Sequence, residues 1–124
     1  MKKFDVLAAF SQNSIEKCFR KLIWLGWDQS ELVGKNLTGR GGLRAAIDQK
    51  KFKSYLSFTI ERWNRLHPKD TPFHVSFDKR KKTMSDLRIQ MDSLCQRATT
   101  LARKKDAIFE ERLLNGETVH GEEI

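Results

Sequence analysis

A long apolar repeat near the C-terminus constrains this fold more than any other feature of the sequence. From residue 83 to residue 114, apolar side chains recur at alternating spacings of three and four residues, which keeps them on one face of an α-helix. At about 1.5 Å per residue, such a helix extends about 45 Å and exceeds the width of a small domain. The repeat therefore predicts one long helix that packs on the rest of the chain along part of its length, with Leu87, Met91, Leu94 and Leu101 facing other helices. Its face, called the seam below, consists of Met84, Leu87, Met91, Leu94, Ala98, Leu101, Lys105 and Ile108, with Lys105 as the polar member.

Apolar residues before the seam predict an N-terminal helical body. Spacings of three and four residues indicate helices at residues 15–26 and 51–66, and a weaker pattern indicates one near the N-terminus. Asn13 and Asp28 are each followed by a glutamate three residues later, which is the capping-box form of a helix start. Another helical pattern begins at Leu43, Ala46 and Ile47.

Together these patterns predict an all-α fold of about five helices. The long C-terminal amphipathic helix, at about residues 83–114, should pack on the N-terminal helical body. We expect a single helical domain at residues 1–114 and an acidic, disordered tail at residues 115–124.

Two connections between the predicted helices leave alternatives open. Residues 35–42 form a polar turn rich in glycine, whose backbone N–H groups could cradle a phosphate beside Arg40 and Arg44. The glycine spacing fits neither the dinucleotide-binding nor the P-loop motif, so an interhelical turn is the favoured interpretation. Phe73, Val75 and Phe77 alternate with polar residues, which suits an extended segment laid over the helices.

The charge of the chain is large and unevenly distributed. The 124 residues have a net charge of +8, with +12 in residues 1–109 and −4 in residues 110–124. A basic body favours polyanionic partners, and nucleic acid is the leading candidate. A solvated basic surface with no partner has the same composition, so both interpretations stay open.

Two groups of cations are the candidate nucleic-acid contacts. Because Lys and Arg neutralise phosphates and release counterions, the leading function is a small nucleic-acid-associated protein that binds mainly through phosphate contacts, with DNA slightly favoured over RNA. Four cations in the first turn of a helix would oppose its dipole, so we expect the second group to form an exposed loop or a frayed first turn. The first group is Arg40, Arg44, Lys50, Lys51 and Lys53, and the second is Lys79, Arg80, Lys81 and Lys82.

The seam supports a second functional hypothesis, a protein–protein interaction module such as an adaptor or an inhibitor of a nucleic-acid enzyme. Exposure of Leu94, Leu101 and Ile108 would favour this hypothesis, and their burial in the body would weaken it. The coiled-coil form of the seam also predicts pairing with a second copy of the chain as a homodimer.

Catalytic, cofactor and membrane signatures are absent from the sequence. The histidines and cysteines lack the close spacing of zinc ligands, and no arrangement of nucleophile and base stands out, so we expect no enzyme, cofactor or metal site. Cys18 and Cys95 lie on apolar faces of predicted helices, which predicts buried free thiols. Without an apolar run of membrane-spanning length or a signal-peptide pattern, the expectation is a cytoplasmic protein with no membrane partner.

Overall fold

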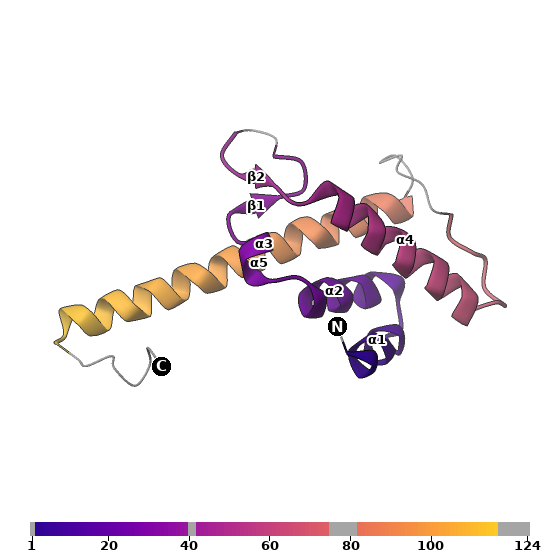
Figure 1. Ribbon diagram of the computed structural model, residues 1–124, viewed down its shortest axis with the longest axis horizontal. Coiled ribbons are helices and arrows are strands. Elements are labelled where there is room, and N and C mark those ends of the chain that lie inside the picture. The colour runs from indigo at the N-terminus through magenta and orange to yellow at the C-terminus, as the bar shows by residue number, and fades with distance from the viewer. Residues whose placement is uncertain (1, 40–41, 75–81, 117–124) are drawn as a thin grey trace.

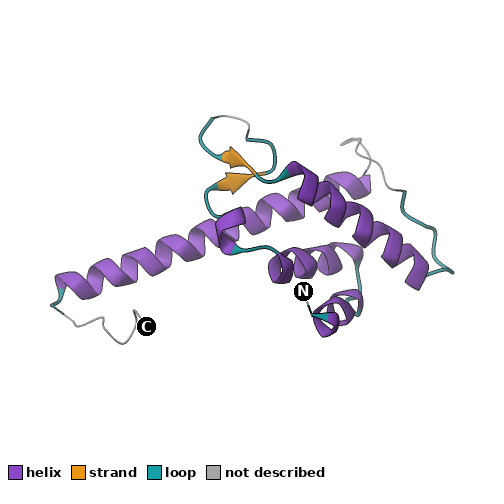
Figure 2. Cartoon of the chain, in the orientation of Figure 1, coloured by secondary structure: helices purple, strands orange, loops and turns teal. Residues whose placement is uncertain are grey.

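The computed structural model describes residues 2–39, 42–74 and 82–116 and shows a mostly helical protein (Figures 1 and 2). One long helix, α5, runs along the longest axis, and the other elements gather around its N-terminal half (Figure 1). The predicted all-α class with a long final helix is therefore confirmed. In the described part of the chain, no helix has the length and apolar character needed to cross a membrane. The elements are α1 (Lys3–Phe10), α2 (Ile15–Gly26), α3 (Gln29–Leu32), β1 (Lys35–Asn36), β2 (Ala45–Ala46), α4 (Gln49–Leu66) and α5 (Lys82–Leu114).

The seam of α5 is buried in its first half and exposed in its second. Leu87 and Leu94 are buried in the core, where α5 packs against α2, α3 and β1. Leu101 is 42% exposed and Ile108 is 52% exposed, because α5 continues beyond the other elements (Figure 1). The expectation that Leu101 faces other helices is therefore wrong, although the long helix itself is confirmed.

The rest of the core forms between α2 and α4. Phe19 and Phe52 meet edge to face with ring centroids 6.2 Å apart, the geometry that the aromatic quadrupole favours. Leu22, Ile23 and Ile60 are also buried around this pair. Each such side chain stabilises the fold by about 1.5–3 kcal/mol relative to an exposed position. The core assignments that the helical spacing predicted for α2 and α4 are confirmed.

Polar side chains fix where the first helices begin. The Ser14 hydroxyl accepts a hydrogen bond from the Lys17 backbone N–H at 3.3 Å, so Ser14 and not Asn13 caps α2. Ser14 has the extended backbone that a cap requires, which displaces the start by one residue. At α3 the predicted capping box is present, and the Asp28 N–H donates to the Glu31 carboxylate at 3.3 Å.

Residues 35–39 and 42–47 form a parallel two-stranded clip where the sequence predicts a turn and the start of a helix. Lys35 pairs with Ala45 and Asn36 pairs with Ala46, and the Ile47 N–H donates to the Asn36 carbonyl at 2.9 Å. These hydrogen bonds engage backbone groups that a helix through residues 43–47 would need.

The predicted helix at Leu43, Ala46 and Ile47 is therefore wrong. Leu43 is 94% exposed, whereas Ile47 is buried, so the three residues do not share a core-facing side. Their spacing covers little more than one helical turn, which is too short to compete with strand pairing. Helix α4 begins instead after Asp48, whose side chain accepts from the Lys51 backbone N–H at 3.0 Å.

Side chains of α5 hold the clip in place. The Asp92 carboxylate accepts a hydrogen bond from the Leu37 N–H at 2.8 Å, and the Thr99 hydroxyl accepts one from the Gly34 N–H at 2.9 Å. These bonds satisfy backbone N–H groups on either side of a very short strand. The clip is thus joined to the middle of the long helix.

Two predicted segments lie partly outside the described residues. Phe73 makes two hydrogen bonds with the Asn64 side chain, donating its N–H at 2.9 Å and accepting at its carbonyl at 2.6 Å. Phe73 also packs against the core, as an extended segment over the helices would. Residues 75–77 of that segment and residues 117–124 of the predicted tail are not described.

Candidate nucleic-acid interface

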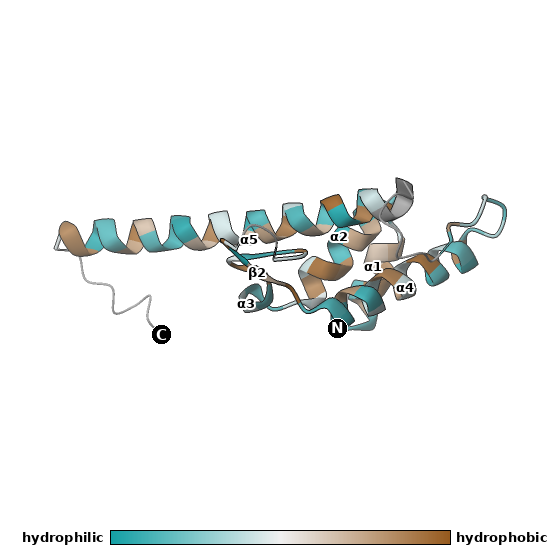
Figure 3. Ribbon diagram, turned by 90° about the horizontal axis from the view of Figure 1, so that it is seen from above, coloured by the Kyte–Doolittle hydropathy of each residue, from teal (hydrophilic) through white to brown (hydrophobic). Residues whose placement is uncertain are grey.

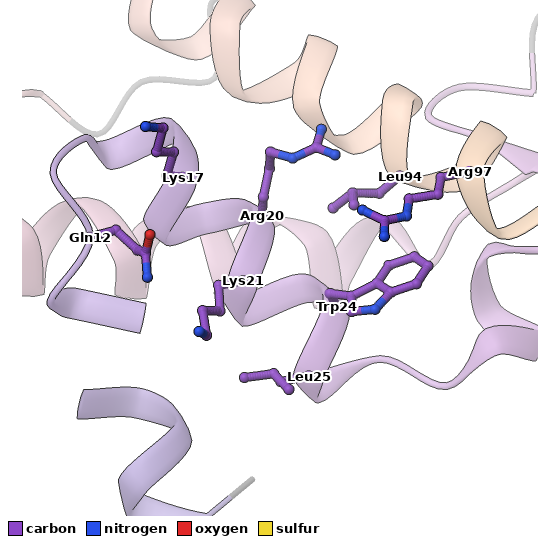
Figure 4. A pocket seen from close by; sticks show the side chains of 8 residues that line it. All are labelled: Gln12, Lys17, Arg20, Lys21, Trp24, Leu25, Leu94 and Arg97. Carbon is purple, nitrogen blue, oxygen red and sulfur yellow. The ribbon is translucent and has the colours of Figure 1, made fainter. Parts of the chain in front are cut away.

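A basic cleft of about 350 Å³ lies between α2 and α5 (Figure 4). Lys17, Arg20 and Lys21 project from α2, and Arg97 projects from α5 on the opposite side. Among the residues that the structure describes, four cations and no carboxylate therefore line this hollow. The remaining lining residues are Gln12, Trp24, Leu25 and Leu94.

The helical spacing of α2 explains why these cations gather. Lys17, Lys21 and Trp24 are separated by four and three residues, so they follow one another along a single side of the helix. That side borders the apolar face containing Phe19 and Leu22, which packs into the core. The cations are thereby held beside α5 while their charged ends stay outside the core.

Arg20 is fixed across the cleft by neutral hydrogen-bond acceptors. Its Nη1 donates to the side-chain amide oxygen Oε1 of Gln90 at 2.8 Å and to the Ser93 hydroxyl at 3.2 Å, and both partners belong to α5. Neither partner neutralises the guanidinium, so its full positive charge remains. A guanidinium has five N–H donors in a planar fork, which leaves donors for a phosphate.

Arg97 lies over the indole of Trp24, 4.9 Å from the ring centroid (Figure 4). This cation–π contact orients the guanidinium without cancelling its charge. Trp24 is half-buried, and the two planar groups form one end of the cleft. A charged group and an aromatic surface are therefore adjacent at this end.

Charge compensation distinguishes this cleft from the cations around α4. None of Lys17, Arg20, Lys21 and Arg97 forms an ion pair with a residue that the structure describes. Their positive charges add, and a concave surface focuses the resulting field. The basic cleft is therefore a better anion site than an isolated surface lysine.

Lys51, from the first predicted group, has structural partners instead. Its Nζ lies 2.7 Å from Glu31 Oε2 and 4.8 Å from the centroid of the Trp27 ring. The hydrogen bond from Lys51 is the main reason that the pKa of Glu31 is lowered. Lys51 therefore ties α4 to α3, and its charge is already compensated.

The other members of the first group do not meet in one described cleft. Arg44 is half-buried beside Asp92 in a separate hollow of about 460 Å³ between the clip and α5. Lys50 and Lys53 are exposed near the start of α4. Arg40 lies outside the described residues. These positions stay predicted contacts, and Lys51 is already held in its ion pair with Glu31.

The second predicted group lies almost wholly outside the described residues. Lys79, Arg80 and Lys81 are not described, and Lys82 is the first residue of α5. The sequence-based prediction for this group therefore stands untested.

The basic cleft was not predicted from the sequence. The α2 side of the cleft could have been predicted, because Lys17, Arg20 and Lys21 fall just outside the apolar face of that helix. Arg97 follows Leu94 by three residues and so borders the seam in the same way. What the sequence did not reveal is that these two borders face each other.

The two cysteines are buried free thiols, as predicted. Burial raises the pKa of Cys18 to about 12 and that of Cys95 to about 11, with a smaller contribution to Cys95 from the nearby Asp92 carboxylate. Both groups stay protonated at neutral pH, and protonated thiols are poor nucleophiles. Among the described residues, no three His, Cys, Asp or Glu side chains cluster as metal ligands would.

We therefore expect neither thiol to react with a disulfide reagent at neutral pH until denaturant unfolds the chain. Above pH of about 8.5 the unfolded chain loses thiol protons that the folded chain retains, so the free energy of unfolding should fall as pH rises further. Thiol titration with and without urea, together with urea unfolding on both sides of that pH, measures both effects. Rapid reaction of the folded protein would contradict the burial of these thiols.

Comparison with models of protein families, with curated proteins and with solved structures finds no match to this chain. The basic cleft and the exposed part of α5 are therefore the features that bear on function.

Proposed function

We propose that this chain is a small nucleic-acid-associated protein that binds the phosphate backbone in the basic cleft. One observation supports the proposal above all others: Lys17, Arg20, Lys21 and Arg97 line one hollow to which the described residues contribute no carboxylate. A phosphate backbone presents successive negative charges, and cations aligned along a groove match that pattern.

Each side chain of the cleft has a distinct part in this proposal. Arg20 is held in place by Gln90 and Ser93, so it loses little freedom when it contacts a phosphate. Lys17 and Lys21 carry compact charges on flexible side chains, so they can adjust to the positions of the phosphates. The Trp24–Arg97 pair offers planar groups on which an unpaired base can stack, so single strands belong among the test ligands.

A salt titration of the wild-type protein tests the proposal directly. With four phosphate contacts, log affinity for mixed-sequence duplex DNA should fall against log salt with a slope of about 3–4, and for single strands with a slope of about 3. Structured RNA in the same assay reports the preference between DNA and RNA. Absence of binding at low salt, or an affinity indifferent to salt, would contradict the proposal.

A protein-interaction module is the second candidate function. The exposure of Leu101 and Ile108 favours it, while the burial of Leu94 restricts it to the second half of the seam. Absence of nucleic-acid binding in the salt titration would leave this candidate as the better one, in the form of an adaptor or an inhibitor of a nucleic-acid enzyme.

The same proposal makes this a binding protein rather than an enzyme. Its two thiols are buried and protonated at neutral pH, which removes the strongest nucleophiles of the described chain. Unpaired thiols also suit a reducing compartment, and on this ground we propose a cytoplasmic location.

A further inference from the structure

The C-terminal half of α5 extends past the body as an amphipathic arm. This arm, residues 100–114, lies alone in Figure 1, and Figure 3 shows hydrophobic residues continuing along it. Phe109 is 43% exposed, a fraction similar to those of Leu101 and Ile108. Only Ala102 and Arg112 of the arm are even half-buried. Apolar groups repeated on one exposed helix face mark an interaction surface.

The exposed face of the arm continues the stripe that is buried in the body. Leu101, Lys105 and Ile108 follow Leu94 and Ala98 at the same alternating spacing. The first half of this stripe packs against α2, so a helix is a demonstrated partner for it. The second half therefore suits another helix lying along the arm.

The charges of the arm indicate which helix could pair with it and in which direction. Arg103, Lys104 and Lys105 form a basic block, and Glu110 and Glu111 form an acidic block further along. A parallel copy of the arm would place like charges together. An antiparallel copy places each basic block against the acidic block of the other copy, which favours that orientation.

We propose that the arm pairs antiparallel with the arm of a second copy of this chain, about a two-fold axis near Ile108. Lys104 and Glu111 are seven residues apart and so occupy equivalent positions beside the seam. The two-fold axis brings Lys104 of each copy next to Glu111 of the other, so this ion pair occurs once on each side of the axis.

The polar seam residue fits this arrangement. In antiparallel register the aliphatic stem of Lys105 lies against Ile108 of the second copy, while its ammonium group reaches the acidic block. A polar residue in a seam fixes register and weakens the contact. Two short arms bury less than the roughly 1,200 Å² of a stable interface, so the dimer is weak and depends on concentration.

The antiparallel arrangement also leaves the basic cleft open. The cleft is lined by α5 only as far as Arg97, whereas the arm begins at residue 100. The two bodies lie at opposite ends of the paired arms and do not compete for the same space. The inference is therefore independent of nucleic-acid binding and is tested without nucleic acid.

A charge swap provides the test, measured by sedimentation equilibrium across a concentration series. Wild-type protein should show a monomer–dimer equilibrium. Lys104→Glu and Glu111→Lys each convert both ion pairs into repulsions, so each should weaken dimerisation by roughly tenfold or more at low salt. The double variant restores both pairs with reversed sign, and its dissociation constant should return close to that of the wild type.

Ile108→Asp is the complementary variant, because it removes apolar contact at the centre of the paired arms. Ile108 is exposed in the monomer, so the variant should keep its helical circular dichroism and lose the dimer. A wild type that is monomeric at all concentrations would overturn the proposal and leave the arm for a different protein. A dimer that survives Ile108→Asp, or one that the charge swap does not restore, would overturn it equally.

Discussion

Replacing Leu94 by alanine should lower the free energy of unfolding by about 2–5 kcal/mol. Leu94 is 2% exposed and lies where α5 packs into the core. The substitution removes apolar surface from the core and leaves a cavity that rigid neighbouring helices cannot fully close. Urea unfolding followed by circular dichroism measures the change.

Leu101→Ala is the matched control, since it makes the same chemical change on the same helix one heptad further on. Leu101 lies on the arm, so its replacement should change the free energy of unfolding by less than about 1 kcal/mol when the protein is dilute enough to be monomeric. A loss from Leu94→Ala below about half a kcal/mol, or equal losses from both variants, would show that the first half of the seam is not a core element.

Neutralising the basic cleft should abolish most of the salt dependence of nucleic-acid binding. The variant carries Lys17→Gln, Arg20→Gln, Lys21→Gln and Arg97→Gln. Each lost phosphate contact reduces the slope of log affinity against log salt by about 0.9 on duplex DNA, so the slope should flatten by about 3–4. Binding to unrelated sequences should weaken about equally, because backbone contacts carry no sequence information.

A control variant with the same loss of charge separates the cleft from general electrostatics. Lys2, Lys3, Arg65 and Lys69 are exposed and lie outside the basic cleft, so glutamine at these four positions should change the slope far less. Melting curves of both variants confirm that each remains folded. If the two variants flatten the slope equally, or the cleft variant leaves it unchanged, the cleft is not the binding surface.

The second cation group that the sequence singled out is tested in the same assay. Replacing Lys79, Arg80, Lys81 and Lys82 by glutamine should flatten the slope by up to about 3–4 if this run also contacts phosphates. Four cations before a helix oppose its dipole, so their removal should leave the melting temperature unchanged or higher. A slope that is unchanged in this variant and flattened in the cleft variant would assign binding to α2 and α5 alone.

Local patterns predicted most of the fold because most elements are helices with one apolar face. The seam, the faces around Phe19 and Phe52 and the capping box at Asp28 are all readable within a few residues of sequence. The clip could not be predicted from such local patterns. Its pairing is two residues long on each strand, and the α5 side chains Asp92 and Thr99 hold it in place.

The basic cleft could be predicted only in part for the same reason. The cations of α2 can be placed on one side of their helix from spacing alone, and so can Arg97 on α5. That the two sides adjoin depends on how α2 packs against α5, which no local pattern specifies. The residues predicted from the sequence were instead cations close together in the chain, because neighbouring charges are easy to recognise without a structure.

The packing of α2 on α5 also sets the order in which the protein can mature on the ribosome. The hydrogen bond between Arg20 and Gln90 joins residues 70 positions apart, so α2 is synthesised long before its partner helix. Until α5 emerges, the side of α2 that will pack on it has no cover, and nascent chains in such a state are prone to aggregate. The basic cleft is lined mainly by α2 and α5, so it needs this late contact. The cleft therefore forms only after translation reaches α5, so a chain that ends before α5 lacks the proposed binding site.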